Sequence, residues 1–173
     1  PQEQSAAEDL LRSLGEREVF FFGGYEGAER KALFFLPEWM EEIQRDFNHP
    51  AIVGWCPHNE TWDKLGRKQF DPAIALIYDV TKAIDTTRPC IDTSGYCHVA
   101  TDVYDDHDYD QNPETFGGRL QRMLETGEPY ITFPREQTHA YCGQPYFVSE
   151  YGGIRWAPQE AAGWGYGQAP MSE

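Results

Sequence analysis

The chain has 173 residues, of which 40% are hydrophobic and 14% aromatic, and its net charge at pH 7 is −15. This length and composition are typical of a globular domain with a substantial apolar core. The negative charge disfavours a nucleic-acid partner, because a phosphate backbone would be repelled. No apolar run is long enough to span a membrane, and residues 1–5 lack signal-peptide character, so we expect a cytoplasmic protein without a membrane partner.

Residues 5–14 have helical apolar spacing behind a Ser cap, and Gly15 follows as a helix terminator. The apolar run at 19–22 is typical of a buried strand. Residues 32–36 fit either another strand or the start of a helix. Pro37 suits the first turn of a helix, which we expect to continue to Phe47.

A short apolar run, Ala51–Trp55, stops abruptly at Cys56-Pro57 and predicts a buried strand. Two polar residues, Asn59 and Glu60, come soon after it. An acidic side chain beyond the carboxyl end of a parallel strand occupies the position at which barrel enzymes carry catalytic groups. Glu60 is therefore the first candidate catalytic residue.

The middle of the chain continues the alternation of helices and strands. Asp71 and Pro72 favour the start of a helix ending at Ile84. The further predictions are short strands at 90–94 and 102–104, an acidic loop at 105–110 and a helix at 113–124.

A second strand followed by a carboxylate occurs near the end of the sequence. Tyr146–Ser149 reads as a strand, and Glu150 and a Gly-Gly pair follow it. From Arg155 onward we expect an irregular active-site loop or a frayed end. Two strands that each lead to a glutamate suggest an active site with two carboxyl groups.

The order of elements predicts an α/β fold with parallel strands. Glu60 and Glu150 are separated by 150 − 60 = 90 residues. A (β/α)8 barrel of about 250 residues uses about 31 residues for each strand and helix, so this separation corresponds to about three units. The two glutamates are therefore expected to end strands n and n+3 of a barrel.

The cysteines give little evidence of a metal or disulfide framework. There is no C-x-x-C pair, so zinc is not expected, and buried reduced thiols are expected at Cys56 and Cys142. A disulfide between Cys90 and Cys97 remains an alternative. The acidic residues of 102–110 lack the spacing of a calcium loop, and we predict neither a metal nor another cofactor.

Two segments resemble glycoside hydrolase family 2, the β-galactosidase and β-glucuronidase family. Residues 45–61, Arg-Asp-Phe-Asn-His-Pro-Ala-Ile-Val-Gly-Trp-Cys-Pro-His-Asn-Glu-Thr, look like its acid/base signature. Residues 146–153, Tyr-Phe-Val-Ser-Glu-Tyr-Gly-Gly, are similar to its nucleophile segment. Residues 87–96 and 102–109 also fit, and the likeness extends over about 37–166.

The resemblance implies a role for each polar residue of the two motifs. Glu60 would be the general acid/base at the end of the fourth barrel strand, and Glu150 the nucleophile at the end of the seventh. Asn59 would bind the 2-hydroxyl group of the sugar. His107 and Tyr109 are candidates for lining the pocket and donating to Glu150, or they are loop residues held by the neighbouring aspartates. Trp156 is a candidate for stacking on a sugar face.

The implied function is that of a retaining exo-β-glycosidase, of β-galactosidase or β-glucuronidase type, with a carbohydrate substrate. The chain has residues for only part of a TIM barrel, about strands four to seven, within 37–173. Residues 1–36 form an atypical N-terminal α/β segment, of which 6–36 resemble part of bacterial S4-domain RNA-binding proteins. The alternative is an inactive fragment or fusion that acts as a carbohydrate-binding or interaction module. Open barrel edges predict a homo-oligomer.

Overall fold

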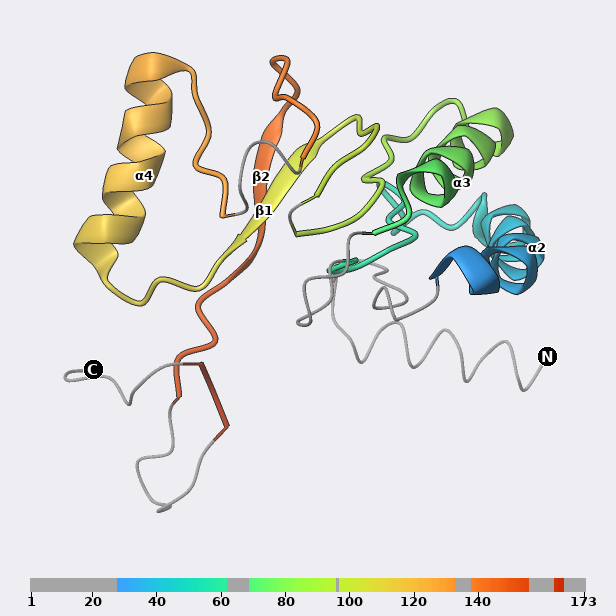
Figure 1. The fold of residues 1–173 in the computed structure, drawn as a ribbon, viewed down its shortest axis with the longest axis horizontal. Coiled ribbons are helices and arrows are strands. Elements are labelled where there is room, and N and C mark those ends of the chain that lie inside the picture. The colour runs from blue at the N-terminus through green and yellow to red at the C-terminus, as the bar shows by residue number, and fades with distance from the viewer. Residues whose placement is uncertain (1–27, 62–68, 96, 133–137, 156–163, 167–173) are drawn as a thin grey trace.

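The computed structural model describes residues 28–61, 69–95, 97–132, 138–155 and 164–166. The predicted helix at 5–14, the predicted strand at 19–22 and Trp156 lie outside these residues. Within them the elements, in chain order, are α2 (Ala28–Asp46), α3 (Asp71–Ile84), β1 (Tyr104–Asp108), α4 (Pro113–Thr126) and β2 (Tyr146–Tyr151) (Figure 1). None of the described helices combines the length and apolarity needed to cross a bilayer.

The strands β1 and β2 pair in parallel, with Tyr104 opposite Tyr146 and Asp108 opposite Tyr151 (Figure 1). The register shifts once, because Asp106 pairs with Val148 and His107 pairs with Glu150. The strand β2 therefore has one extra residue, Ser149, at this point. Such bulges re-aim side chains, and this one brings His107 directly opposite Glu150.

Two further segments continue the parallel arrangement through isolated bridges, Trp55 with Cys90 and Asn59 with Ser94. The segment after Cys90 also contacts β1, because the backbone N–H of His107 donates to the carbonyl of Gly95 over 3.3 Å. The predicted strands at 51–55 and 90–94 thus appear as single parallel bridges, and their order in space follows their order in the chain. This arrangement agrees with an α/β fold with parallel strands.

The prediction of a loop at 105–110 is wrong for Asp105–Asp108, which belong to β1. All five residues of this strand are buried. Acidic residues are uncommon in strands, but here their oxygens accept hydrogen bonds from distant segments. The carboxylate of Asp105 accepts from Ser94, and that of Asp106 accepts from the N–H of Thr132 over 2.6 Å.

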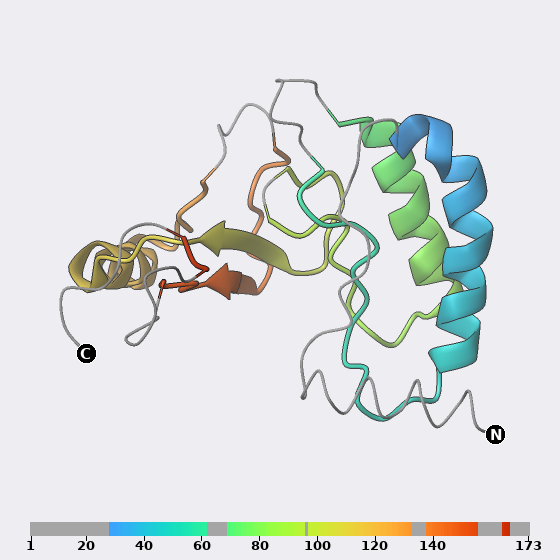
Figure 2. The same cartoon turned by 90° about the horizontal axis from the view of Figure 1, so that it is seen from below.

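The helices α2 and α3 lie side by side (Figure 2). Their apolar faces enclose a core with the strand segments, formed by Trp39, Ile43, Ile52, Trp55, Ile77 and Cys90. The indole N–H of Trp39 donates to the hydroxyl of Thr81 over 2.8 Å and fixes the two helices at this point. The core therefore holds the segment that leads from Trp55 to Glu60.

The predicted bounds of α3 are confirmed, but those of α2 are not. The helix α2 begins at Ala28 and runs through Pro37, so the strand alternative for 32–36 is excluded. A proline inside a helix costs about 3 kcal/mol, because it removes a hydrogen bond and crowds the preceding turn. Burial of Trp39 and Ile43 on the following turns offsets this cost. The helix also crosses the predicted boundary between 36 and 37.

Asp85 caps α3 and joins it to the strand segment of Trp55. Its carboxylate accepts from the indole of Trp55 over 2.9 Å and from Arg88 over 2.7 Å. The hydroxyl and backbone N–H of Thr87 donate to its other oxygen. Burial alone would raise the pKa of Asp85, but these donors hold it well below its usual range.

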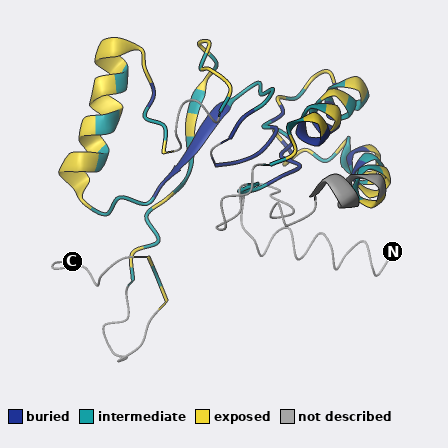
Figure 3. Ribbon diagram, in the orientation of Figure 1, coloured by how far each residue is buried: buried dark blue, intermediate teal, exposed yellow. Residues whose placement is uncertain are grey.

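The helix α4 is two residues longer than predicted, and Gly117-Gly118 does not break it. Asn112 caps its first turn, and Gly127 ends it in a left-handed conformation with φ 72°. None of its residues is buried (Figure 3), and Leu124 is 81% exposed. Homo-oligomerisation through open barrel edges stays a prediction.

All four cysteines are free thiols, so the alternative of a Cys90–Cys97 disulfide is excluded. Cys56 is buried as predicted. Cys142 is exposed, contrary to prediction, because it lies in an irregular segment before β2.

Candidate active site

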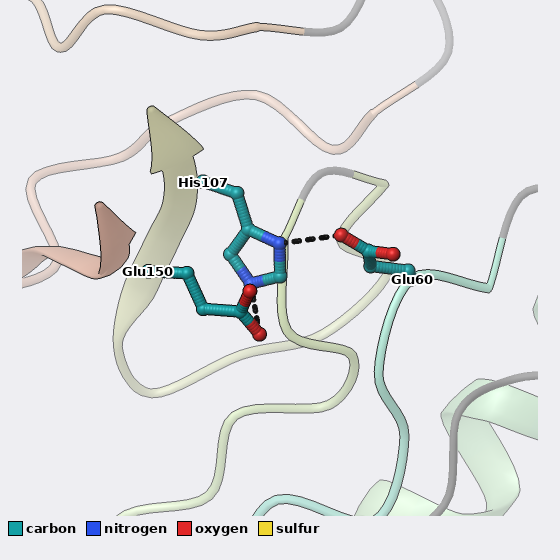
Figure 4. Close-up of side chains that lie close together, drawn as sticks. All are labelled: Glu60, His107 and Glu150. Atoms are coloured by element: carbon teal, nitrogen blue, oxygen red, sulfur yellow. Dashed lines mark hydrogen bonds and ion pairs between the residues drawn. The ribbon is translucent and has the colours of Figure 1, made fainter. Parts of the chain in front are cut away.

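Glu60, His107 and Glu150 meet at one place, although they are far apart in the chain (Figure 4). Nδ1 of His107 lies 2.9 Å from Oε1 of Glu60. Nε2 of the same ring lies 3.4 Å from Oε1 of Glu150. One imidazole ring thus contacts both glutamates that the sequence predicts to be catalytic.

Glu60 is held in an unusual backbone conformation just after the Asn59–Ser94 bridge. Its φ is 47°, in the left-handed region that few residues other than glycine adopt. Its backbone N–H donates to the carbonyl of Ser94 over 2.8 Å, which keeps the turn in place. Conformations of this kind cost about 1–3 kcal/mol and cluster at functional sites. The turn directs the carboxyl group toward His107 (Figure 4).

Glu150 lies within β2, which continues to Tyr151, and not after the strand as predicted. The phenolic hydroxyl of Tyr109, just beyond β1, donates to Oε2 of Glu150. Burial and this hydrogen bond both raise the pKa of Tyr109, so the hydroxyl keeps its proton and remains a donor.

The three side chains differ in their access to solvent. The His107 side chain is 0% exposed, whereas those of Glu60 and Glu150 are 39% and 34% exposed. The carboxyl groups therefore reach the surface, and the ring lies behind them. Burial by itself lowers the pKa of His107, but the hydrogen bond with Glu60 and the charges of Glu150 and Asp105 outweigh burial and raise it.

A buried polar network supports the ring from behind. The hydroxyl of Ser94 donates to Oδ2 of Asp105 over 2.7 Å and lies 3.0 Å from Nε2 of His107. Ser149 also donates to Oδ2 of Asp105. His98 bridges Asp105 and Asp92, with Nδ1 2.7 Å from the carboxylate of Asp92.

The two aspartates decide the charge of His98. Burial lowers the pKa of His98, but hydrogen bonds to Asp105 and Asp92 raise it to about 10, so the ring is a buried cation. Ser94, His98 and Asp105 were not predicted from the sequence as site residues. The sequence offered one signal for Asp105. Residues two apart on a strand share a face, so Asp105 would lie on the same face as His107 if this segment were a strand.

Comparisons with known proteins identify the family of this chain. Residues 26–157, well over half of the chain, match the TIM barrel domain of the glycosyl hydrolases family 2. The chain belongs to glycoside hydrolase family 2. A stretch of 79 residues is 35% identical to a beta-galactosidase of Alteromonas mediterranea. That stretch is 42% of this chain but 8% of the galactosidase, so the chain spans a small part of that curated relative.

The family match places the fold as part of a TIM barrel domain. The match begins within the N-terminal segment that we assigned to 1–36, and it includes all of α2. Whether that segment is a separate domain, and whether the strands are the fourth to seventh of a barrel, stay predictions.

Asn59, the predicted contact of the sugar 2-hydroxyl in this family 2 domain, is partly buried beside Glu60. Its Oδ1 is inaccessible to solvent and has no hydrogen-bond partner among the described residues. A buried amide oxygen without a partner is costly, which is consistent with a position set by function. Contact of Asn59 with a sugar stays a prediction.

Glu60, His107 and Glu150 also have the chemistry of metal ligands, since one ligand atom of each lies within 4.8 Å of the others. However, the two ring nitrogens of His107 face different carboxyl groups, and no single nitrogen contacts both. We therefore interpret the cluster as two carboxyl groups on either side of one imidazole ring and assign it no metal.

Proposed function

We propose that this chain carries both catalytic carboxyl groups of a retaining exo-β-glycosidase that hydrolyses terminal β-linked sugars. The observation that carries the proposal is the convergence of Glu60 and Glu150 on the ring of His107. Membership of glycoside hydrolase family 2 supports glycoside hydrolysis as the reaction class.

The separation of the two carboxyl groups favours retention of configuration. One oxygen of Glu60 lies within 4.8 Å of one oxygen of Glu150. Retaining enzymes hold their carboxyl groups about 5–5.5 Å apart, whereas inverting enzymes need about 6.5–9.5 Å to admit a water molecule. The shorter separation leaves room for direct attack by a carboxylate on the anomeric carbon.

In the first step, a carboxylate oxygen of Glu150 attacks the anomeric carbon while Glu60 gives its proton to the glycosidic oxygen. The bond between the anomeric carbon and that oxygen breaks, and a glycosyl ester of Glu150 forms. In the second step, Glu60 takes a proton from water, and the oxygen of that water displaces Glu150 as a carboxylate. Tyr109 orients Glu150 through its hydroxyl throughout.

Neutral β-galactosides are the first substrates to test. The relative with 35% identity is a beta-galactosidase. A glucuronide adds a carboxylate, and a chain with a net charge of −15 disfavours an anionic ligand unless a local cation binds it. β-Glucuronides are therefore the second choice.

The deciding experiment incubates the chain with a 2-fluoro β-galactoside that has a good leaving group and identifies the labelled residue by mass spectrometry. We expect a covalent sugar on Glu150, and turnover of nitrophenyl β-galactoside that falls about 1000-fold or more in Glu150→Gln. Glu114→Gln, on the exposed first turn of α4, is the matched control and should retain wild-type turnover.

Circular dichroism on the same samples separates loss of chemistry from loss of folding. A folded chain that neither labels nor turns over any nitrophenyl β-glycoside would contradict the proposal. That result would favour a fragment that retains the motifs without the activity.

A further inference from the structure

We infer that His107 and Glu60 share a single proton, because Nε2 of His107 is permanently protonated and only Nδ1 can exchange a proton with Glu60. His107 is thereby a positioning residue that sets when Glu60 carries the proton of the glycosidase reaction. The role in catalysis rests on the proposed function, whereas the protonation of the ring is a property of the fold.

Ser94 fixes the state of Nε2. Its hydroxyl has one hydrogen, which it donates to Oδ2 of Asp105 over 2.7 Å. Its oxygen can then only accept from Nε2 of His107, which lies 3.0 Å away. Glu150 lies on the same side of the ring, 3.4 Å from Nε2, and its carboxylate also favours a hydrogen there.

Asp105 is a strong acceptor for the hydrogen of Ser94. This carboxylate is fully buried and also accepts from the hydroxyl of Ser149 and the backbone N–H of Gly95. The cationic ring of His98 lies 3.2 Å from its other oxygen. Such a carboxylate favours donation by the hydroxyl of Ser94, because a hydrogen bond to a charged acceptor is stronger than one to a neutral ring nitrogen or hydroxyl.

The opposite nitrogen faces Glu60. Nδ1 and Oε1 lie 2.9 Å apart, a hydrogen-bond distance that requires one proton between them. With Nε2 already protonated, the proton is either on a neutral Glu60 that donates to Nδ1 or on a cationic ring that donates to the carboxylate. The two forms differ by a shift of one proton along one hydrogen bond.

Three carboxyl groups and one phenol surround this ring. Glu60 faces Nδ1, Glu150 faces Nε2, Asp105 lies behind Ser94, and the phenol of Tyr109 packs edge-on with ring centroids 6.1 Å apart. The negative charges favour the cationic ring while Glu150 is ionised. Formation of the glycosyl ester removes the charge of Glu150, so the covalent step and the shared proton are coupled.

The proton balance through the reaction follows from this coupling. When Glu60 protonates the leaving oxygen, Nδ1 and Oε1 are both acceptors and their contact becomes repulsive. The proton that Glu60 takes from water in the second step restores the hydrogen bond. The structure thus favours rapid return of a proton to Glu60 and regeneration of the acid.

The ring state is tested by nitrogen-15 NMR of the full chain labelled at histidine. We expect Nε2 of His107 to be protonated across pH 5–9 and the Nδ1 signal to lie between the protonated and unprotonated values. Loss of the signals in His107→Asn assigns them. Ser94→Ala should weaken the preference for protonated Nε2, which Glu150 alone would then support, whereas Ser149→Ala, which leaves Ser94 in place, should retain it. An unprotonated Nε2 at pH 7 in the wild-type chain would overturn the inference.

Two variants separate the ends of the ring in the kinetic test. In His107→Asn the side-chain amide reaches the position of Nδ1, and in His107→Gln it reaches the position of Nε2. Because neither shares a proton with Glu60, we expect the alkaline limb of kcat/KM to move at least about one pH unit lower in both. His107→Asn should move it further, since its N–H stabilises the Glu60 anion.

A merely structural role for His107 would lower kcat without moving this limb, and that outcome would contradict the inference. If the wild-type chain has no turnover, the proposed function fails. The NMR measurement still decides the state of the ring in that case.

Discussion

The ring of His107 packs directly against the backbone of Gly95. A Cβ atom at Gly95 would lie 2.9 Å from Cε1 and 3.0 Å from Nδ1 of the ring, and the φ of Gly95 is 116°. Glycine is therefore required here both for the conformation and for the close approach. The position of Gly95 fixes the distance between the ring and the segment that carries Ser94.

We expect Gly95→Ala to lower the free energy of unfolding by about 1–3 kcal/mol and to displace the His107 ring. Gly117→Ala is the matched control, since a Cβ there meets nothing within 4 Å and Gly117 lies in α4. That control should stabilise the chain by about 0.5–1 kcal/mol. Urea unfolding measures both, and equal effects of the two variants would contradict the packing argument.

Tyr109→Phe removes the hydroxyl that donates to Glu150. A hydrogen bond to a charged group contributes about 1.5–3 kcal/mol, so we expect kcat/KM for a nitrophenyl β-galactoside to fall about 10- to 100-fold. Tyr151→Phe serves as the control, because Tyr151 is exposed at the end of β2. Unchanged kinetics in Tyr109→Phe would show that this hydroxyl does not orient Glu150 for the proposed reaction.

The left-handed conformation of Glu60 predicts that glycine at this position raises the free energy of unfolding. Glycine adopts this conformation without steric cost, so Glu60→Gly should be more stable than Glu60→Gln by about 1 kcal/mol. Both variants should lose activity toward substrates with poor leaving groups. Comparing their urea midpoints is the measurement, and a less stable Gly variant would argue against strain at this turn.

The buried cation at His98 predicts that stability falls at alkaline pH. Its pKa is raised from 6.5 to about 10, so the folded state binds a proton that the unfolded state has lost between these values. The free energy of unfolding should therefore be highest below pH 6.5 and decrease by up to about 1.4 kcal/mol per pH unit until pH 10.

Urea titrations at pH 6, 8 and 9.5 measure this slope. His98→Asn should be less stable at pH 6 and have a flatter dependence, whereas His139→Gln, at an exposed position, should retain the wild-type slope. A wild-type stability that rises over this range would exclude a charged His98.

Asp85→Asn tests the junction between α3 and the strand segment of Trp55. The substitution removes a buried charge that accepts from Trp55, Thr87 and Arg88, and we expect a loss of about 3–5 kcal/mol in the free energy of unfolding. The control, Asp79→Asn, is exposed on the same helix and should change stability by less than about 0.5 kcal/mol. Similar losses in both variants would contradict a stabilising role for the hydrogen bonds of Asp85.

The sequence predicted the elements whose signals are local. Asp71 and Pro72 mark the start of α3, and its bounds are confirmed. The start of α2 was misjudged, because Pro37 is normally a first-turn residue and only the packing of Trp39 and Ile43 allows it inside a helix. The acidic run of β1 was misjudged for a similar reason, since its hydrogen-bond partners come from distant segments.

The sequence by itself determined the family and predicted the two catalytic glutamates, because both motifs are contiguous runs around Glu60 and Glu150. Only the tertiary structure decided what lies between them. The parallel bridges and the extra residue Ser149 in β2 bring His107 opposite Glu150, and the left-handed turn brings Glu60 to the other side of the ring. Such contacts depend on pairing between segments that are 90 − 55 = 35 to 150 − 107 = 43 residues apart, which local spacing does not encode.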